Sequence, residues 1–408
     1  MLCPGCIEDG SMEQRELLAE ERIPEEPARD HLQRITPERW CVTRTDLQSL
    51  RTTIRKAIDG GSIEPTERDN FDPADDIIGP SVYTINQQFL LPLTAVDGPG
   101  GGLSWALMRH SQGLKCDLFV THAWSEGIFE FIDKVLETWP KGANNAYCCM
   151  LSNPQHYITE FLTGQLKDSP FAIALHEAKY LLVVPNQACS IYSRLWCAFE
   201  AYLAYQQDMT ILIARRPIWR KYAKAAILVC VSACLGAACA VIIRVVQCHD
   251  SVIVLVSSIV ALVCTVLSMV SRIFWARRAC HFIGAFGFSF AAASGGVPNL
   301  DLGPTVLFLS SLCCLVLETD LVRAEEAYEE GKQIQVGWSG SVKHAKCSHA
   351  QDAAAIHAAI CGCEDEVDDA IAVLIRSGMS TRDLREAAHA GVNIEEAGQF
   401  DLGDPFII

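Results

Sequence analysis

A tryptophan and a glutamate four residues apart, Trp196 and Glu200, form the sharpest chemical feature of the sequence, within the segment SRLWCAFEAYL. Residues four apart share one face of a helix, so the ring and the carboxylate can stand together at one site. Ser193 lies where a cap residue would accept a hydrogen bond from the first turn of that helix. The alternative is a solvated or capping glutamate on a structural helix.

Other polar side chains follow three apolar segments. They are His122 and Trp124 after the first segment, Ser152 and Asn153 after the second, and Asn186 after the third. Ligands bind beyond the carboxyl ends of parallel strands, so we expect these side chains to line one site with Ser193, Trp196 and Glu200. Each has a structural alternative, because Asn and Ser are common turn residues, His122 fits a hydrogen-bonded structural histidine and Trp196 fits the core.

The segments that position these residues alternate between strand and helix. Apolar runs predict strands, and the helical spacing of apolar residues predicts a helix over 127–139 and another through Glu200. This alternation predicts a doubly wound parallel α/β sheet. The expected strands are 117–121, 147–151, 181–184 and 209–214.

Five regions follow from composition. We expect an acidic, disordered leader over 1–36, then a helix and loops over 37–110 that pack on an α/β domain over 111–222. The helix carries Leu47, Leu50, Ile54 and Ile58 on one face. An apolar block occupies 223–323, and a helical region with a small all-α domain occupies 324–408.

The segments FVTHAW, LLVVPN and SRLWCAFEAYL resemble the Toll/interleukin-1 receptor (TIR) family. The whole arrangement is similar to TIR-like multi-pass membrane proteins of dinoflagellates and other algae. The resemblance implies a flavodoxin-like fold, NAD as substrate, Glu200 as the catalytic residue and Trp196 beside it. Cleaving nicotinamide from ribose develops positive charge, which a carboxylate stabilises. His122, Trp124, Asn153, Asn186 and Ser193 would then contact the nucleotide.

Two departures from that family keep a non-catalytic reading open. Residues 121–124 read THAW where plant TIR enzymes have an aromatic-Arg-Gly stretch, so a basic residue of the nucleotide site is replaced. The predicted strands are also not followed by a glycine-rich phosphate loop.

The apolar block predicts four membrane spans, over 225–245, 252–270, 279–297 and 305–322. Basic residues precede the first span, lie between the second and third, and follow the fourth, so both termini are expected in the cytosol. Gly284 and Gly287 would let helices approach closely. Glu318 and Asp320 stand at the end of the last span, where we expect them to reach water. Membrane lipid is therefore an expected partner.

Charge and cysteine content limit the other partners. The formal net charge is -16, which argues against nucleic acid. The 19 cysteines lack the spacing of a disulfide framework and are read as reduced thiols, with Cys197 a packing residue. A lone CxxC at Cys3 and Cys6, and a scattered His and Cys set over 344–363, lack regular zinc spacing, so we assign no metal site.

The sequence thus favours a membrane protein that presents a cytosolic TIR-like signalling or interaction domain and self-associates through that domain or its spans. The alternative is a TIR-type NAD nucleosidase that uses Glu200. A channel or transporter subunit has less support, because the middles of the predicted spans lack ionisable residues.

Overall fold

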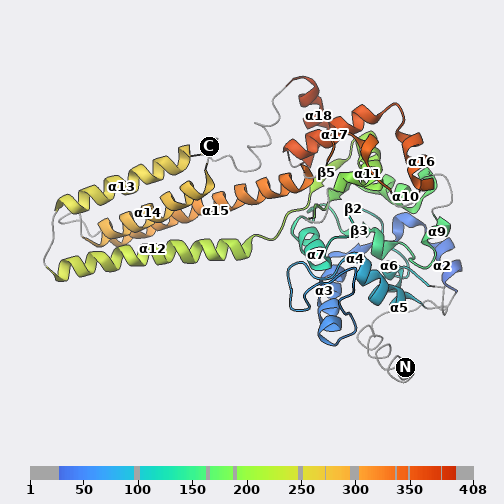
Figure 1. The fold of residues 1–408 in the computed structure, drawn as a ribbon, viewed down its shortest axis with the longest axis horizontal. Helices are drawn as coiled ribbons and strands as arrows, with labels where there is room; N and C mark the ends of the chain where they lie inside the picture. The colour runs from blue at the N-terminus through green and yellow to red at the C-terminus, as the bar shows by residue number, and fades with distance from the viewer. Residues whose placement is uncertain are drawn as a thin grey trace. The chain divides into compact units, whose positions relative to one another are not determined.

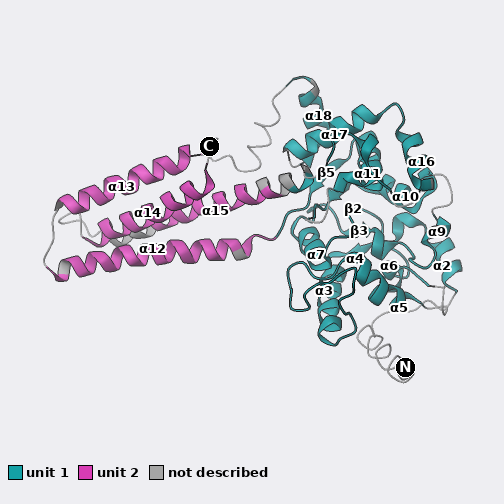
Figure 2. Ribbon diagram, in the orientation of Figure 1, with its two compact units in different colours: residues 1–216, 330–395 teal, residues 217–329, 396–408 magenta. Residues whose placement is uncertain are grey.

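The computed structural model divides into two compact units (Figure 2). Residues 1–216 with 330–395 form the α/β unit, and residues 217–329 with 396–408 form the helical unit. Residues 1–26 of the expected leader lie outside the described residues, and Ala28–Arg34 forms a helix, α2. The structure describes residues 27–95, 102–161, 166–186, 191–246, 251–271, 273–294, 303–335, 338–347, 350–377 and 379–391.

A six-stranded mixed sheet lies at the centre of the α/β unit (Figure 1). Its strands are β1 (Val42–Thr43), β2 (Leu118–Thr121), β3 (Asn145–Cys148), β4 (Tyr180–Val183), β5 (Thr210–Ile213) and β6 (Met379–Ser380). The order is β1-β3-β2-β4-β5-β6, with β2 to β5 parallel and the two edge strands antiparallel to their neighbours. The predicted α/β sheet is confirmed, but it is mixed, because two short edge strands add pairs that no apolar run predicts.

Helices surround this sheet. Short single turns also occur at Pro37–Arg39, Asn86–Leu90, Leu166–Asp168, Ile191–Ser193 and Val342–His344. The helices of the α/β unit are α3 (Arg44–Asp59), α4 (Val82–Ile85), α5 (Leu91–Thr94), α6 (Trp105–Arg109), α7 (Ile128–Glu137), α8 (Cys149–Ser152), α9 (Ile158–Phe161), α10 (Pro170–Glu177), α11 (Leu195–Gln206), α16 (Ala350–Ile360), α17 (Glu364–Ser377) and α18 (Arg382–His389).

Both faces of the sheet are covered. Phe119 of β2 and Leu181 of β4 belong to one core, with α10, α11, α16 and α17, whereas Val120 and Leu182 belong to a second core with α3 and α7. Successive side chains of a strand point to opposite faces, which is why neighbouring residues enter different cores. The result is a three-layer α/β/α arrangement in which the central strands are mainly apolar.

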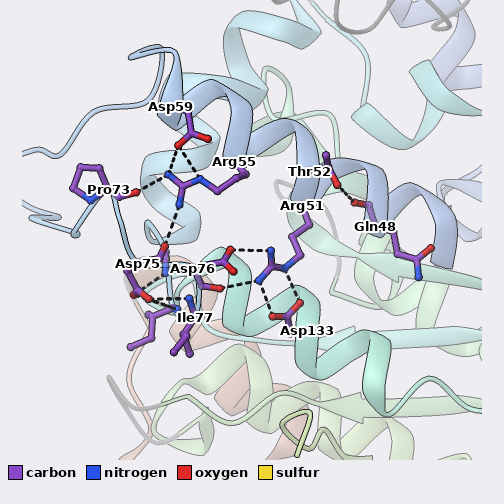
Figure 3. Close-up of polar contacts among 12 residues, drawn as sticks. Gln48, Arg51, Thr52, Arg55, Asp59, Pro73, Asp75, Asp76, Ile77 and Asp133 are labelled. Atoms are coloured by element: carbon purple, nitrogen blue, oxygen red, sulfur yellow. Dashed lines mark hydrogen bonds and ion pairs between the residues drawn. The ribbon is translucent and has the colours of Figure 1, made fainter. Parts of the chain in front are cut away.

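Helix α3 fastens the N-terminal region to α7. Its apolar face is buried, as the spacing of Leu47, Leu50, Ile54 and Ile58 predicts. On its polar side, Arg51 Nε donates to Asp133 of α7 at 2.7 Å, and Arg51 also donates to the side chain and backbone of Asp76 (Figure 3). Arg55 binds the backbone carbonyl of Pro73. The loop over 73–77 is therefore held between α3 and α7.

The C-terminal segment completes the α/β unit. Strand β6 pairs with β5, and α16 and α17 pack on α11. The backbone also bridges at Lys346, whose N–H donates to Ser193 O at 2.7 Å and whose carbonyl accepts from Leu195 N at 2.9 Å. This differs from the separate all-α domain expected from the sequence, because the apolar faces of these helices are buried against α11.

The helical unit contains α12 (Trp219–Val245), α13 (Ser251–Val270), α14 (Phe274–Ala293) and most of α15 (Gly303–Gln335). Within the described residues, two stretches, Lys221–Ile243 and Val252–Val270, are long and apolar enough to span a membrane by length and composition. Most side chains in both are exposed. The four expected spans all fall on helices, but only these two meet that standard; residues 295–297 of the third lie outside the described residues.

The contacts within the helical unit differ from expectation at one acid. Helix α14 packs against both α12 and α13, and a Cβ added at Gly287 would lie 3.1 Å from Ser257 O of α13, which agrees with the expected close approach. Glu318, however, does not reach water. It is buried, with Arg278 Nε and His281 Nδ1 each 2.7 Å from its carboxylate oxygens. Two basic partners from α14 allow this acid to be buried.

Candidate functional site

Glu200 lies on α11 against the carboxyl end of β2. Its side chain is almost wholly buried, at 6% exposure. Burial raises the pKa of Glu200 to about 7, although the Thr121 hydroxyl beside it and the charge of Arg194 act in the opposite direction. A carboxyl group with such a pKa changes charge near neutral pH, which is a common property of functional acids.

Trp196 contacts different elements from Glu200. Its ring lies 5.1 Å from that of Phe171 of α10, and its indole N–H donates to Asp352 of α16 at 3.4 Å. Its helical spacing from Glu200 is as predicted, yet the C-terminal segment occupies the polar edge of its ring. Trp196 thus joins α11 to α10 and α16.

Around the end of β2, the structure brings His122 and Trp124 to the first residue after β3. His122 Nε2 lies 3.1 Å from Cys149 Sγ, and Trp124 Nε1 donates to the same sulfur at 3.3 Å. On the other side of the imidazole ring, Nδ1 lies 2.8 Å from Glu126 Oε1, without aligned hydrogen-bond angles. The side chains of His122 and Glu126 are fully buried.

The remaining predicted residues lie at separate places. Asn153 is buried, and its side-chain oxygen accepts from the hydroxyl of Tyr147. Asn186 is buried just after β4, and residues 187–190 beyond it are outside the described residues. Ser193 is not the cap expected for the helix of Glu200, because α11 begins at Leu195 and Arg194 occupies the cap position.

Charged groups on α7 surround the buried end of this site. Burial raises the pKa of Glu126 well above its usual range, partly opposed by the charge of Lys134 and reinforced by that of Glu130. Lys134 is itself fully buried, with its amine 3.0 Å from Glu130 and bonded to the carbonyl of Pro185 after β4. Arg216 also binds Glu130, so the buried amine and carboxylate are both partnered.

The loop between β2 and α7 is held from the N-terminal region. The backbone N–H of Val82 donates to Glu126 O at 3.0 Å, and that of Tyr83 donates to Trp124 O at 3.2 Å. At Gly127, an added Cβ would lie 2.2 Å from Ile78 O. Only glycine allows the two backbones to approach so closely. The clamp of α3 on residues 73–77 thus supports the loop that carries His122, Trp124 and Glu126.

Sequence reasoning missed Cys149 and Glu126. The second strand was expected over 147–151, but it ends at Cys148, and the chain enters α8 at Cys149. That shift turns the Cys149 side chain toward His122 and Trp124. The spacing of His122 and Glu126, four residues apart at a strand end, was an available signal. In the part of the chain that the structure describes, no three His, Cys, Asp or Glu side chains are grouped to hold a metal ion.

Comparison with protein-family models, with curated proteins and with solved structures gives no match for this chain. The geometry of the site therefore carries the functional argument alone.

Proposed function

We propose that the chain is a membrane-anchored protein whose α/β unit is a TIR-like signalling or interaction module. The parallel strands follow the order β3-β2-β4-β5, which is the order of flavodoxin-like doubly wound sheets. The two apolar helices support a membrane anchor, and the four helices α12 to α15 would supply four spans with both termini in the cytosol.

Burial of the polar side chains favours a module over a nucleotide-cleaving enzyme. Glu200 is 6% exposed, so a ribose has little access to its carboxylate. The indole N–H of Trp196 is bonded to Asp352. A glutamate so little exposed suits a domain that presents surfaces better than one that cleaves NAD, and self-association through the α/β unit or the spans is the expected mode of signalling.

Membrane anchoring and topology can be tested on the full chain expressed with a tag at each terminus. We expect the protein to stay with membranes during alkaline carbonate washing. Both tags should be cut by protease added to the cytosolic face of sealed vesicles. Release by carbonate, or protection of either tag, would contradict the proposed arrangement. Concentration-dependent cross-linking in detergent then tests self-association, and a monomer at every concentration would count against it.

NAD cleavage is the second candidate function, favoured by one observation, the pKa of Glu200 near 7. The full chain in detergent would be incubated with NAD at several protein concentrations. The module proposal expects no nicotinamide release. Release that is lost in Glu200→Gln, with Glu137→Gln of α7 unchanged as an exposed-helix control, would establish the enzyme instead.

A further inference from the structure

Cys149, His122 and Glu126 form a line of three side chains. Nε2 of the imidazole ring lies 3.1 Å from Cys149 Sγ, and Nδ1 lies 2.8 Å from Glu126 Oε1. A nucleophile, a base within reach of it, and an acid that orients the base are the parts of a nucleophilic catalytic group. The cysteine and the glutamate contact opposite nitrogens of one ring, so the three groups form a proton path and do not converge on a metal.

The burial of the three groups suits this role. His122 and Glu126 are fully buried, which fixes the imidazole ring, whereas Cys149 is half-buried and therefore partly exposed to solvent. Trp124 adds a second N–H donor to the sulfur at 3.3 Å. Once Nε2 of His122 has taken the thiol proton, it becomes an N–H donor to the sulfur as well, and two such donors stabilise the thiolate, which is the nucleophilic form of cysteine.

Nearby thiols lack these partners. Burial raises the pKa of Cys148 well above its usual range, and burial also raises that of Cys197. The Cys197 thiol faces the backbone carbonyl of His122 at 3.7 Å, where it can only donate a proton. Cys149 therefore differs from Cys148 and Cys197 in its contacts, because its sulfur lies within reach of the ring nitrogens of His122 and Trp124.

We propose that Cys149 is a nucleophile for acyl transfer from esters or thioesters, with His122 as its general base and Glu126 as the residue that positions His122. The Cys149 proton moves to Nε2, and the sulfur electron pair forms a bond to the acyl carbon. The bond from that carbon to the leaving oxygen or sulfur breaks, and the leaving group takes the proton from Nε2. Water, deprotonated by the same nitrogen, then releases the acid and restores the thiol.

The misaligned contact of His122 with Glu126 is consistent with this role, because catalytic hydrogen bonds are often loose before substrate binds. Other titratable and charged groups influence the same site, and the variants below separate their effects on a pH profile from that of His122. They are Glu130 and Lys134 on α7, Tyr147 and Cys148 on β3, Cys197 and Glu200 on α11, and Arg194 before α11.

The first test follows alkylation of the full chain in detergent by iodoacetamide, with each cysteine read by mass spectrometry. A thiol in water loses about tenfold in reactivity for each pH unit below its pKa of about 8.5. The exposed Cys361 serves as the reference thiol and is measured in the same samples between pH 8 and pH 6. Cys149 should lose less than about threefold over the same range. Equal slopes at the two cysteines would overturn the proposal.

Variants separate an activated thiol from a merely accessible one. In His122→Gln, the alkylation rate of Cys149 should fall with decreasing pH as steeply as that of Cys361. In Glu126→Gln, the fall should be intermediate. Because His122 is buried, its variant can fail to fold, so Trp124→Phe provides a second test on a half-buried residue. In Trp124→Phe, the alkylation rate of Cys149 should fall more steeply with decreasing pH than in the unmodified protein. Unchanged slopes in folded variants of both residues would also overturn the proposal.

The second test asks for acyl transfer itself. The full chain would be mixed with p-nitrophenyl acetate, and we expect release of p-nitrophenol with an acetyl group found on Cys149 ahead of Cys361. The adduct should disappear in Cys149→Ser and form at least about tenfold more slowly in His122→Gln. Acetylation of Cys361 at the same rate, or none on Cys149, would exclude the acyl-transfer role.

Discussion

Two regions of the α/β unit bury an acid against a histidine, and they differ in how the acid is hydrogen-bonded. At the start of α3, Asp46 lies 2.7 Å from His110 Nε2 and 3.2 Å from Arg109 Nε, and it also accepts from the backbone N–H and the hydroxyl of Thr43. At the end of β2, Glu126 lies 2.8 Å from His122 without an aligned hydrogen bond. The first acid is fully partnered, and the second is not.

The pKa values follow this difference. Burial alone would raise the pKa of Asp46, but hydrogen bonds from His110 and Thr43 outweigh it and lower that pKa below its usual range. Burial raises the pKa of Glu126, and its surroundings do not reverse the change. An acid beside a histidine is therefore a hydrogen-bonded helix cap in one place and a buried acid without an aligned hydrogen bond in the other. What distinguishes them is how many donors the acid receives.

The largest expected effect is at the partnered acid. Asp46→Asn removes the charge that His110 and Arg109 face and weakens the cap of α3, so we expect a loss of about 4 kcal/mol in the free energy of unfolding. Glu126→Gln should not lower that free energy at neutral pH, because the ionised form of this acid is already unfavourable. Urea unfolding of the full chain in detergent, followed by hydrogen exchange of α3 and β2 amides, measures both.

The pH dependence sharpens this contrast. Asp46 has a lowered pKa in the folded state, so its contribution is present above its unfolded pKa of about 3.9 and is lost as the pH falls through the folded value. The difference between Asp46→Asn and the unmodified protein should therefore shrink in strong acid. A difference that stays constant down to the acid limit would contradict the assignment of charge to this cap.

The next effect has the opposite sign and concerns Glu200. Its folded pKa of about 7 exceeds the unfolded value near 4.5, so the cost of ionising it is absent below pH 4.5, grows between pH 4.5 and 7, and is constant above. Glu200→Gln should therefore raise the free energy of unfolding by at most about 3 kcal/mol at pH 8 and leave it unchanged at pH 4. A loss of stability at pH 8 would show that the charged form is partnered.

Much of the α/β unit was predictable because its strands are continuous apolar runs. The run over Leu181, Leu182 and Val183 predicts a strand covered on both sides, and both cores contain its side chains. The edge strands β1 and β6 were not predictable, because each has two residues and is too short to show an alternation of apolar and polar side chains. The burial of α16 and α17 on α11 depends on tertiary packing, which local patterns do not contain.

The candidate site was predicted in part. His122 and Trp124 were found because polar residues at strand ends converge in parallel sheets. Cys149 was missed because apolar character continued past the true end of β3, so the cysteine was read as a strand residue. Glu318 was misplaced for a related reason, since its partners Arg278 and His281 lie about 40 residues away in sequence, beyond any local pattern.

A smaller effect tests how the Glu126 region is held. Gly127→Ala places a Cβ against Ile78 O, so the backbone must shift, at a cost of about 2 kcal/mol. The shift moves the loop of His122 and Glu126, and we expect alkylation of Cys149 to slow. Exchange of the Asp46 amide should stay as it was. If hydrogen exchange becomes faster at both acid and histidine pairs, the two pairs are held by shared contacts and not by separate ones.

The smallest expected effect comes from the arginine clamp of Figure 3. Arg51 is half-buried and binds Asp133 and Asp76, so Arg51→Gln should cost about 1 kcal/mol, and less at high salt. Lys56→Gln is the control on the same helix, because Lys56 is exposed to solvent, and it should lower the free energy of unfolding by less than about 0.5 kcal/mol. Arg51 holds residue 76 near the loop of Glu126, so amide hydrogen exchange should become faster at residues 122–127 after Arg51→Gln. Exchange at the start of α3 should not change, because Asp46 has its own hydrogen-bond donors there. If Arg51→Gln lowered the stability no more than Lys56→Gln and left exchange at 122–127 unchanged, the Glu126 loop would be held by contacts other than Arg51.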